Sequence, residues 1–297
     1  MVSGQWSANV PCERGEPLSP VPYPLRLKGA TMSQDIKSLR NRIKSVKSTL
    51  HLTKAMGLVA SSKIRRAQEA RLKSEEYKNA LGSIVDVLSA SQECEKSPYM
   101  SVREGKAKIV VIAGDRGLAG GYNVNVFRLV KELQNVDIHP IGKKACEKYG
   151  KAVISSEQFS YDDAYNLAKE LCGDFESEKY AKIGIVSTEY VSMITQEPKL
   201  TWILPLSKTE KTGDVGAIFE PDELTILNEA VPIYVAGIIY QATRESFACE
   251  VVARRSAMDS AGKNATTMID DLQLKYNRAR QGAITQEITE IVAGSGE

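Results

Sequence analysis

Two stretches of the chain, residues 33–90 and 222–292, repeat apolar residues at helical spacing and contain only one proline, Pro232. In the first stretch the apolar positions step by three and four residues, which keeps one stripe of a helix against a partner helix. We therefore predict two long helices that pair as an antiparallel coiled coil. The stripe of the first helix runs through Ile36, Leu39, Ile43, Val46, Leu50, Thr53, Gly57, Ala60, Ile64, Ala67, Arg71, Ser74, Lys78, Leu81, Val85 and Leu88.

The stripe of the second helix consists mainly of small residues, which allow two helices to approach closely. The stripe of the first helix is polar or thin in its middle, at Arg71, Ser74 and Lys78, so we expect a weak seam there. The predicted positions on the second helix are Cys249, Ala253, Ala257, Ala261, Ala265, Met268, Leu272, Tyr276, Ala279 and Ala283.

The C-terminal end of the second helix is predicted to extend beyond the first. If the helices pair from the hairpin end, the second is longer by about 13 residues, or about 20 Å. Ile284, Ile288 and Ile291 form an apolar stripe in this part. The end of the helix either frays into solvent, as termini commonly do, or is covered by another protein, and the three isoleucines favour the second interpretation.

Between the two helices the period changes, and strand-like and helix-like segments alternate. This alternation is typical of a mainly parallel α/β sheet. Strands are predicted at 109–113, 137–141, 152–156 and 183–188, with helices at 123–135, 143–149 and 162–175. Residues 199–206 are predicted to add an antiparallel edge strand, and residues 207–221 to form a loop.

The predicted fold is α/β, a long antiparallel coiled coil of N- and C-terminal helices with an inserted Rossmann-like α/β domain. Residues 1–31 contain five of the eleven prolines and no periodicity, so we expect a disordered extension there and expect natural translation to begin at Met32. The predicted domains are the extension 1–31, the first coiled-coil helix 32–92, the α/β domain 93–221 and the second coiled-coil helix 222–297.

The charge of the chain is unevenly distributed. The net charge is +2, but residues 33–80 contain 12 Lys and Arg against four acidic residues. Such a basic helix is either a solvated face or a surface for nucleic acid, anionic lipid or an acidic protein. The chain has no predicted transmembrane run of 18 or more apolar residues. Five scattered cysteines indicate neither a disulfide framework nor a zinc site, and we expect no metal or cofactor.

A glycine-rich turn, Gly114-Asp-Arg-Gly-Leu-Ala-Gly-Gly121, follows the first predicted strand. Turns of this type can hold a phosphate group, but the spacing matches neither the dinucleotide motif nor the P-loop motif. A tight turn that needs positive φ and close backbone packing is the favoured alternative. Asp115 and Arg116 could pair within this turn or contact a partner. No catalytic motif is present, so an enzyme based on the middle domain is disfavoured.

Three segments together resemble the γ subunit of F-type ATP synthase. They are Leu52-Thr-Lys-Ala-Met-Gly-Leu-Val-Ala-Ser-Ser-Lys63, Gly114-Asp-Arg-Gly-Leu-Ala-Gly-Gly-Tyr-Asn123, and Tyr276-Asn-Arg-Ala-Arg-Gln281 with Ile284-Thr-Gln-Glu-Ile-Thr-Glu-Ile-Val-Ala-Gly294. The resemblance runs in order from Met32 to the C-terminus. It implies a non-catalytic rotor shaft that couples ion-driven rotation of the c-ring to the conformational cycle of the catalytic β subunits.

The partners implied by the resemblance are the α and β subunits, the ε subunit and the c-ring, with no nucleic acid. The protein would be peripheral to the membrane, on the cytoplasmic face of the bacterial inner membrane. The family's pattern places Met56 near a lever of β, and a positive charge added there is expected to disturb coupling. It also places Arg280, Gln281, Thr285 and Glu287 against β, although Arg280 on its own pattern is a solvated helix arginine. Ile284, Ile288 and Ile291 would form an apical bearing, and Asp115 and Arg116 belong to a turn in the foot.

A coiled-coil nucleic-acid binder is the main rival interpretation, because it would also use a long basic helix. Its binding to DNA would depend strongly on salt. Tyr77 is the only aromatic residue in residues 33–79, so the basic residues are not interleaved with the aromatic residues that such binders often use. The resemblance to the rotor subunit is therefore preferred.

Overall fold

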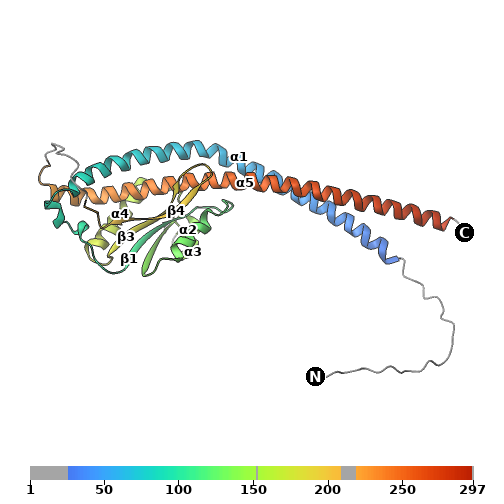
Figure 1. The fold of residues 1–297 in the computed structure, drawn as a ribbon, viewed down its shortest axis with the longest axis horizontal. Coiled ribbons are helices and arrows are strands. Elements are labelled where there is room, and N and C mark those ends of the chain that lie inside the picture. Colours follow the sequence, from blue (N-terminus) through green and yellow to red (C-terminus); the bar gives the residue numbers. More distant parts are fainter. Residues whose placement is uncertain (1–25, 152, 209–218, 296–297) are drawn as a thin grey trace, which may run out of the picture. The chain divides into compact units, whose positions relative to one another are not determined.

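The computed structural model describes residues 26–151, 153–208 and 219–295, and the side chains of residues 26–34 are not described. The chain divides into two compact units. The smaller unit contains residues 1–45 and 270–297, and the larger unit contains residues 46–269. Figure 1 shows the elements, whose order is α1 (Arg26–Ser89), η1 (Glu93–Lys96), η2 (Pro98–Met100), β1 (Ala107–Ile112), α2 (Tyr122–Lys131), β2 (Val136–Ile141), α3 (Lys143–Tyr149), α4 (Tyr161–Glu176), β3 (Lys182–Tyr190), β4 (Gln196–Leu204) and α5 (Glu223–Gly294).

The sheet of the larger unit has the strand order β2-β1-β3-β4. Strand β1 pairs in parallel with both β2 and β3, and β4 pairs antiparallel with β3 at one edge. The predicted parallel sheet with an antiparallel edge strand is therefore confirmed. The crossover from β1 leads to β2 on one side of β1, and the crossover from β2 leads to β3 on the other side, so the point where the strand order reverses lies between β1 and β3.

The strand predicted at 152–156 is wrong. Residue 152 lies outside the described residues, and residues 153–156 are not in a strand. Val153 is exposed, and the Ile154 carbonyl accepts a hydrogen bond from the Gly142 amide at 2.9 Å. The amides of Ser156 and Glu157 donate instead to the Asp115 carboxylate, because this segment caps the glycine-rich turn rather than extending the sheet.

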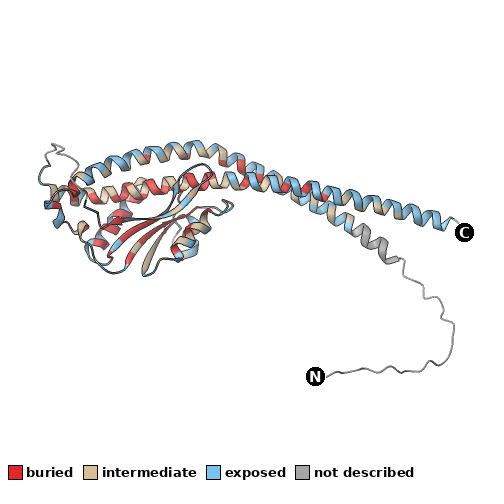
Figure 2. Ribbon diagram, viewed as in Figure 1, coloured by how far each residue is buried: buried red, intermediate tan, exposed pale blue. Residues whose placement is uncertain are grey.

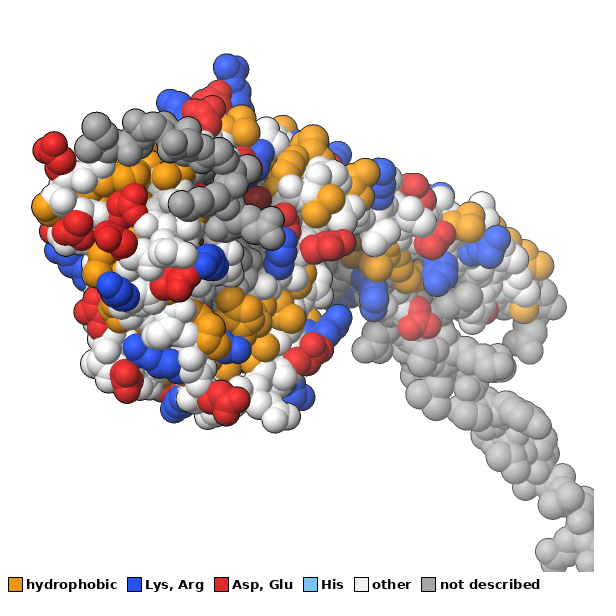
Figure 3. Space-filling model, turned by 60° about the vertical axis from the view of Figure 1, so that its left-hand side comes forward, with side chains coloured by type: hydrophobic (Ala, Val, Ile, Leu, Met, Phe, Trp, Pro, Cys, Tyr) orange, Lys and Arg blue, Asp and Glu red, His pale blue; other side chains and the backbone are white. Residues whose placement is uncertain are grey.

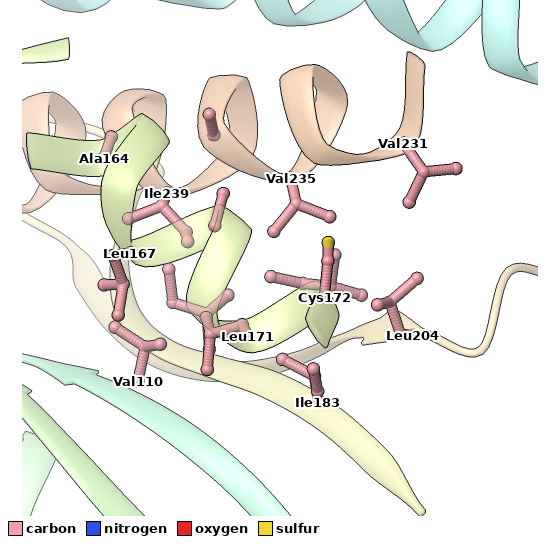
Figure 4. Packing of buried hydrophobic residues seen from close by; sticks show 14 of the residues in the cluster. Val110, Ala164, Leu167, Leu171, Cys172, Ile183, Leu204, Val231, Val235 and Ile239 are labelled. Atoms are coloured by element: carbon pink, nitrogen blue, oxygen red, sulfur yellow. The ribbon is translucent and has the colours of Figure 1, made fainter. Parts of the chain in front are cut away.

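Side chains of β1 alternate between two apolar clusters, as the period of a strand requires. Ile109 and Val111 pack with Val126 and Val130 of α2 on one face of the sheet. Val110 and Ile112 belong to the larger cluster on the other face. Figure 4 shows this second cluster, in which α4 lies between the sheet and α5. Its labelled members include Val110, Leu167, Leu171, Ile183, Val231, Val235 and Ile239.

Helix α5 contains a window long and apolar enough to cross a membrane by length and composition, which the sequence interpretation did not anticipate. Its residues Leu227, Val231, Val235 and Ile239 are fully buried in the cluster against α4 and the sheet. Packing within the larger unit therefore explains part of the apolar character of this window, of which 33% is buried.

Within the larger unit, α1 and α5 pack antiparallel, as predicted. Gly82 faces Tyr234, Gly57 faces Met258, and Gly262 faces Leu50 and Thr53, so the residue number falls along α1 as it rises along α5. Glycine and alanine permit this close approach. Figure 2 shows buried positions recurring along both helices. Apart from Ser89, the buried residues on α1 fall on the predicted stripe; they are Thr53, Gly57, Ala60, Ala67, Ser74, Val85 and Leu88.

One predicted position on α5 is wrong. Met268 is 45% exposed, whereas Ile269 is buried with Ala265 and Leu272. A step of four residues from Ala265 leads to Ile269, and a step of three leads to Met268. The packed face follows the step of four here, which is one of the two steps that a helix of 3.6 residues per turn permits.

The smaller unit consists, in its described part, of residues 26–45 of α1 and 270–294 of α5. Ile36, Leu39 and Ile43 are half-buried, as are Tyr276 and Ala279 on α5. Helix α1 begins at Arg26, so residues 26–31, which we expected to lack structure, are helical. Residues 1–25 of the predicted extension lie outside the described residues.

Candidate functional site

The carboxylate of Asp115 ties three segments of the larger unit together. It accepts hydrogen bonds from the amides of Lys143, Ser156 and Glu157 at 2.9 to 3.0 Å and from the Ser155 hydroxyl at 2.6 Å. Burial alone would raise the pKa of Asp115, but these hydrogen bonds outweigh burial and lower it. All four hydrogen bonds favour the ionised form of the carboxylate. Asp115 thus holds the turn to α3 and the following loop, rather than pairing with Arg116.

Two glycines of the turn are required by its geometry. Gly120 has φ +59°, a left-handed conformation that favours glycine. A Cβ atom at Gly114 would lie 2.7 Å from the carboxyl carbon of Glu250, on α5. The hypothesis of a tight turn with close packing is therefore confirmed, and the group packed on Gly114 is a carboxylate of the chain itself.

Glu250 and Arg254 form an ion pair on successive turns of α5 that faces the glycine-rich turn. Their side chains are 2% and 12% exposed. Arg254 also donates to the carbonyl oxygens of Arg116 and Gly117 at 3.3 Å. Leaving either ion alone in this position would be costly, because the desolvated charge would lose its compensation. The pair therefore fixes the turn on α5.

Arg244 makes a second polar attachment between α5 and the sheet domain. Its guanidinium donates to the carbonyl oxygens of Ser156 at 2.7 Å and Phe159 at 2.9 Å. Its carbon Cζ lies 5.4 Å from the centroid of the Tyr240 ring. Burial lowers the pKa of Arg244. The loop held by Asp115 from one side is thus held by α5 from the other.

The carboxyl ends of β1 and β3 also contact α5 through polar groups. The Tyr122 hydroxyl donates to the Ser246 carbonyl at 3.0 Å, and the Thr188 amide donates to the Ser246 hydroxyl at 3.1 Å. In open α/β sheets, the crevice at this reversal point is where ligands commonly bind. Here Ser246 of α5 attaches the long helix to the sheet, and a pocket of about 430 Å³ lined by Tyr122, Thr188 and Ala253, among others, stays open beside it.

A polar cluster lies in the middle of the α1 stripe, where the sequence predicted a weak seam. Arg71 pairs with Glu75 at 3.0 Å and lies 3.9 Å from Glu245 of α5. The Arg71 guanidinium is 5.2 Å from the Tyr190 ring centroid, and the Tyr190 amide donates to Glu245 at 3.1 Å. The seam is polar here because it joins both helices to the end of β3.

Met56 is half-buried and lines a pocket of about 260 Å³ in the larger unit. The pocket is bounded by α1, the glycine-rich turn, the loop at Glu157 and α5. Asp115 and Arg116 also line it, so three of the residues named from the sequence lie together. The full lining is Ala55, Met56, Val59, Ala60, Lys63, Asp115, Arg116, Glu157, Phe247, Glu250, Val251 and Arg254.

The other residues named from the sequence belong to the smaller unit and are exposed. Arg280, Gln281 and Glu287 present exposed side chains, and the Thr285 hydroxyl donates to the Gln281 carbonyl at 2.9 Å. The isoleucine stripe is also exposed, with fractions of 47%, 56% and 70% for Ile284, Ile288 and Ile291. These residues remain free for contact with another protein.

Sequence reasoning did not find Arg244, Glu250 and Arg254. Glu250 and Arg254 have the spacing of an exposed helical ion pair, and their partners in the turn are more than 130 residues away in the chain. The only indication in the sequence was that Glu250 and Arg254 are four residues apart and directly follow Cys249 and Ala253, two members of the small-residue stripe. Within the described ranges, no group of three His, Cys, Asp or Glu side chains could hold a metal ion.

The face seen in Figure 3 carries basic and acidic side chains interspersed with apolar ones. Basic and acidic side chains of the larger unit also pair with each other: Lys63 pairs with Glu157, and Arg255 pairs with Asp259 at 2.8 Å. Part of the basic excess of α1 is therefore compensated inside the chain.

Comparison with known proteins identifies the family. Residues 35–296 match the family model described as ATP synthase. The chain is 36% identical to the ATP synthase gamma chain of Geotalea uraniireducens, with 88% of this chain and 97% of that protein covered. It is 37% identical to the ATP synthase gamma chain of Geobacter sp. (strain M21), with coverage of 88% and 98%.

Solved structures share the fold. The rotor of the Euglena gracilis mitochondrial ATP synthase aligns with a TM-score of 0.62 at 17% identity and covers 85% of this chain and 99% of that chain. A chain of the central stalk and c-ring of the Tetrahymena thermophila enzyme aligns with a TM-score of 0.57 at 20% identity and covers 71% and 99%. The predicted family resemblance is confirmed, and this chain belongs to the ATP synthase gamma chain family.

Proposed function

We propose that this protein is the central rotor shaft of an F-type ATP synthase and performs no bond chemistry itself. The observation that carries the proposal is the attachment of the sheet domain to α5. Buried polar groups join the carboxyl edge of the sheet to the same helix whose terminal residues are exposed. A domain turned by a neighbouring rotor part could thus pass torque to a helix that contacts other subunits.

Coupling in such a shaft depends on differential contacts. A ring of three catalytic β subunits surrounds one asymmetric shaft, so each β meets a different face. A contact that is more favourable in one β conformation shifts the population toward that conformation. Turning the shaft moves the preference from one β to the next, and the reverse process lets ATP hydrolysis drive rotation.

The basic part of α1 suits contact with an acidic lever on β. Surface ion pairs are each worth only about 0–1 kcal/mol, so they can be exchanged as the shaft turns. Met56 lies on this helix, and we assign it to the region near the lever. Arg280, Gln281, Thr285 and Glu287 are assigned to contacts with β, since all four are exposed.

Ile284, Ile288 and Ile291 are assigned to an apical bearing inside the ring formed by α and β. Apolar contact lacks directional bonds, so it permits rotation while removing these side chains from water. Asp115 and Arg116 are assigned to the foot, that is, to the α/β domain that the ε subunit and the c-ring would contact; because they line the same pocket as Met56, they belong to the part of this domain beside the β lever. In this assembly the chain is peripheral to the membrane, at the cytoplasmic face of a bacterial cell membrane.

Co-purification tests the proposal directly. A tagged chain, expressed in its native host at its natural level, is expected to recover α and β subunits together with ATPase activity. Recovery of nucleic acid instead, with a strong dependence on salt, would support the nucleic-acid binder. Recovery of neither ATPase subunit would contradict the rotor function.

Truncation tests the assigned tip. Removing the residues after Arg280 should leave the larger unit folded, because it ends at Ile269. The expected result is weakened assembly or a lower yield of ATP-driven proton pumping per ATP hydrolysed. An unchanged pumping yield would contradict the role given to the C-terminal residues.

A further inference from the structure

Helix α1 contacts the sheet domain at three places, and at each place α5 contacts the same segment of the sheet domain. At the first, Lys63 of α1 pairs with Glu157, and the Glu157 carbonyl accepts a hydrogen bond from Arg244 of α5 at 3.4 Å. Both side chains of the ion pair are more than a third exposed, so the pair by itself contributes little to stability.

At the second place, tyrosines of the two long helices meet one tyrosine of the sheet domain. The Tyr77 hydroxyl of α1 lies 3.1 Å from that of Tyr161, at the start of α4. Their rings meet edge to face with the centroids 5.7 Å apart. The Tyr161 ring also meets the Tyr240 ring of α5 edge to face, at 5.8 Å. Tyr161 thus contacts a tyrosine of each long helix.

The third place lies between the other two along α1 and is centred on Tyr190, the last residue of β3. The Tyr190 hydroxyl accepts a hydrogen bond from the Gln68 amide at 3.3 Å, and the Arg71 guanidinium lies 5.2 Å from the ring centroid. The Tyr190 amide donates to Glu245 of α5 at 3.1 Å. The side chains of Arg71 and Glu245 are only 16% and 14% exposed, so solvent weakens these contacts less than it weakens the ion pair of Lys63.

The three places lie on both flanks of the seam between the long helices. At about 100° per residue, Lys63 and Tyr77 fall on one side of the α1 stripe that faces α5, and Gln68 and Arg71 fall on the other. Residues 63 to 77 extend over about 20 Å of helix. Contacts on both flanks, at three points along the helix, oppose rolling of α1 around α5 as well as sliding along it.

We propose that these contacts fix the angular position of α1 around α5, and that Tyr190 is the positioning residue at their centre. This role rests on the proposed rotor function, in which β contacts Met56 and the basic surface of α1. Coupling requires that each β meets a defined face of the shaft, so α1 must keep its angle relative to the sheet domain that turns it. Tyr190 acts by holding α1 and needs no contact of its own with β.

Hydrogen exchange of the full chain, followed by mass spectrometry, tests whether Tyr190 holds α1. Tyr190→Ala removes the ring and the hydroxyl, so the amides of residues 63–77 are expected to exchange about tenfold faster, the factor expected when one cation–π contact and one hydrogen bond are lost. Residues 227–239 of α5 should exchange at the wild-type rate. Unchanged exchange in both segments, or equal acceleration in both, would overturn the proposal.

Proton pumping by the assembled enzyme tests the role in coupling. Tyr190→Ala should lower the number of protons pumped per ATP hydrolysed, whereas Tyr190→Phe keeps the ring under Arg71 and should stay close to the wild type. Arg71→Met removes the same contact from the α1 side. It should cause a similar loss, and it decides the question if the alanine variant does not fold.

Val130→Ala is the matched control. Val130 is buried on the face of the sheet opposite to α4 and α5, so its truncation should lower stability and keep the pumping yield. A wild-type yield for Tyr190→Ala and Arg71→Met, or an equal loss for Val130→Ala, would overturn the role of Tyr190 and leave the rotor function intact. A wild-type chain that does not assemble with α and β would instead contradict the rotor function, and the role of Tyr190 with it.

Discussion

Two regions of α5 differ in which side chains they bury. In residues 244–254, in the larger unit, charged side chains are buried and bonded to the sheet domain, as with Arg244, Glu250 and Arg254. In residues 280–292, in the smaller unit, apolar side chains are exposed, and the helix offers isoleucines to solvent. The first region has its partners within the chain, whereas the second presents groups that an external partner would cover.

The contrast indicates how one helix can serve two purposes. Buried ion pairs and backbone hydrogen bonds have strict geometry, so they fix α5 to the sheet domain in one arrangement. Apolar contacts depend on area more than on direction, so they suit an interface whose partner changes its orientation. Fixed attachment and sliding contact are the two properties that a rotating shaft needs.

The largest effect on stability is expected from Glu250→Ala. The substitution leaves the Arg254 guanidinium, which is 12% exposed, without its carboxylate. Breaking a buried pair in this way should lower the free energy of unfolding by about 3 kcal/mol. Urea denaturation of the full chain, followed by circular dichroism, measures the change.

Asp259→Ala is the matched control for that substitution. Asp259 pairs with Arg255 on the same helix at the same spacing, but the two side chains are 54% and 39% exposed. The loss should be about 0.5 kcal/mol. Equal losses for the two variants would mean that burial does not distinguish the anchored region.

A smaller loss is expected from Gly114→Ala. The new Cβ would lie 2.7 Å from the Glu250 carboxyl carbon, and the ion pair with Arg254 limits how far that carboxylate can move. Overpacking of this kind costs about 1–3 kcal/mol. Gly117→Ala is the control, because a Cβ there meets nothing within 4 Å. If both variants unfold at the same urea concentration, the close packing of the turn on α5 is not important for stability.

The acid limb of the stability profile tests Asp115. Its pKa is lowered in the folded chain, so the ionised carboxylate stabilises the fold above its unfolded pKa of about 3.9. This contribution should fall as the pH drops below about 4 and through the lower folded pKa, because protonation removes an acceptor. Asp115→Asn should flatten the dependence of the melting temperature on pH between about 4 and 2. An identical acid slope in the two proteins would show that the four hydrogen bonds do not depend on ionisation.

The sequence predicted those features that depend on short-range periodicity. The stripe of α1 and the main strands follow from spacing within a few residues, and the register of Thr53, Gly57 and Ala60 was correct. Met268 was misplaced because steps of three and four are both helical. The strand at 152–156 was wrong because the hydrogen bonds of this loop go to Asp115, about 40 residues earlier. The site formed by Glu250 and the turn depends on contacts across more than 130 residues, so no local pattern indicated it.

The smallest effect on stability, with the clearest effect on assembly, is expected from Ile288→Ser. Ile288 is 56% exposed, so the free energy of unfolding of the isolated chain should change by less than about 0.5 kcal/mol. If the isoleucine stripe enters a ring of partner subunits, the lost burial should weaken assembly with α and β about tenfold or more. Ile288→Leu keeps the apolar area and should assemble normally, which separates loss of contact from disturbance of the helix. Sedimentation of the mixed subunits measures the fraction assembled. A serine variant that assembles as well as the leucine variant would show that the exposed region of α5, unlike its anchored region, has no partner at this position.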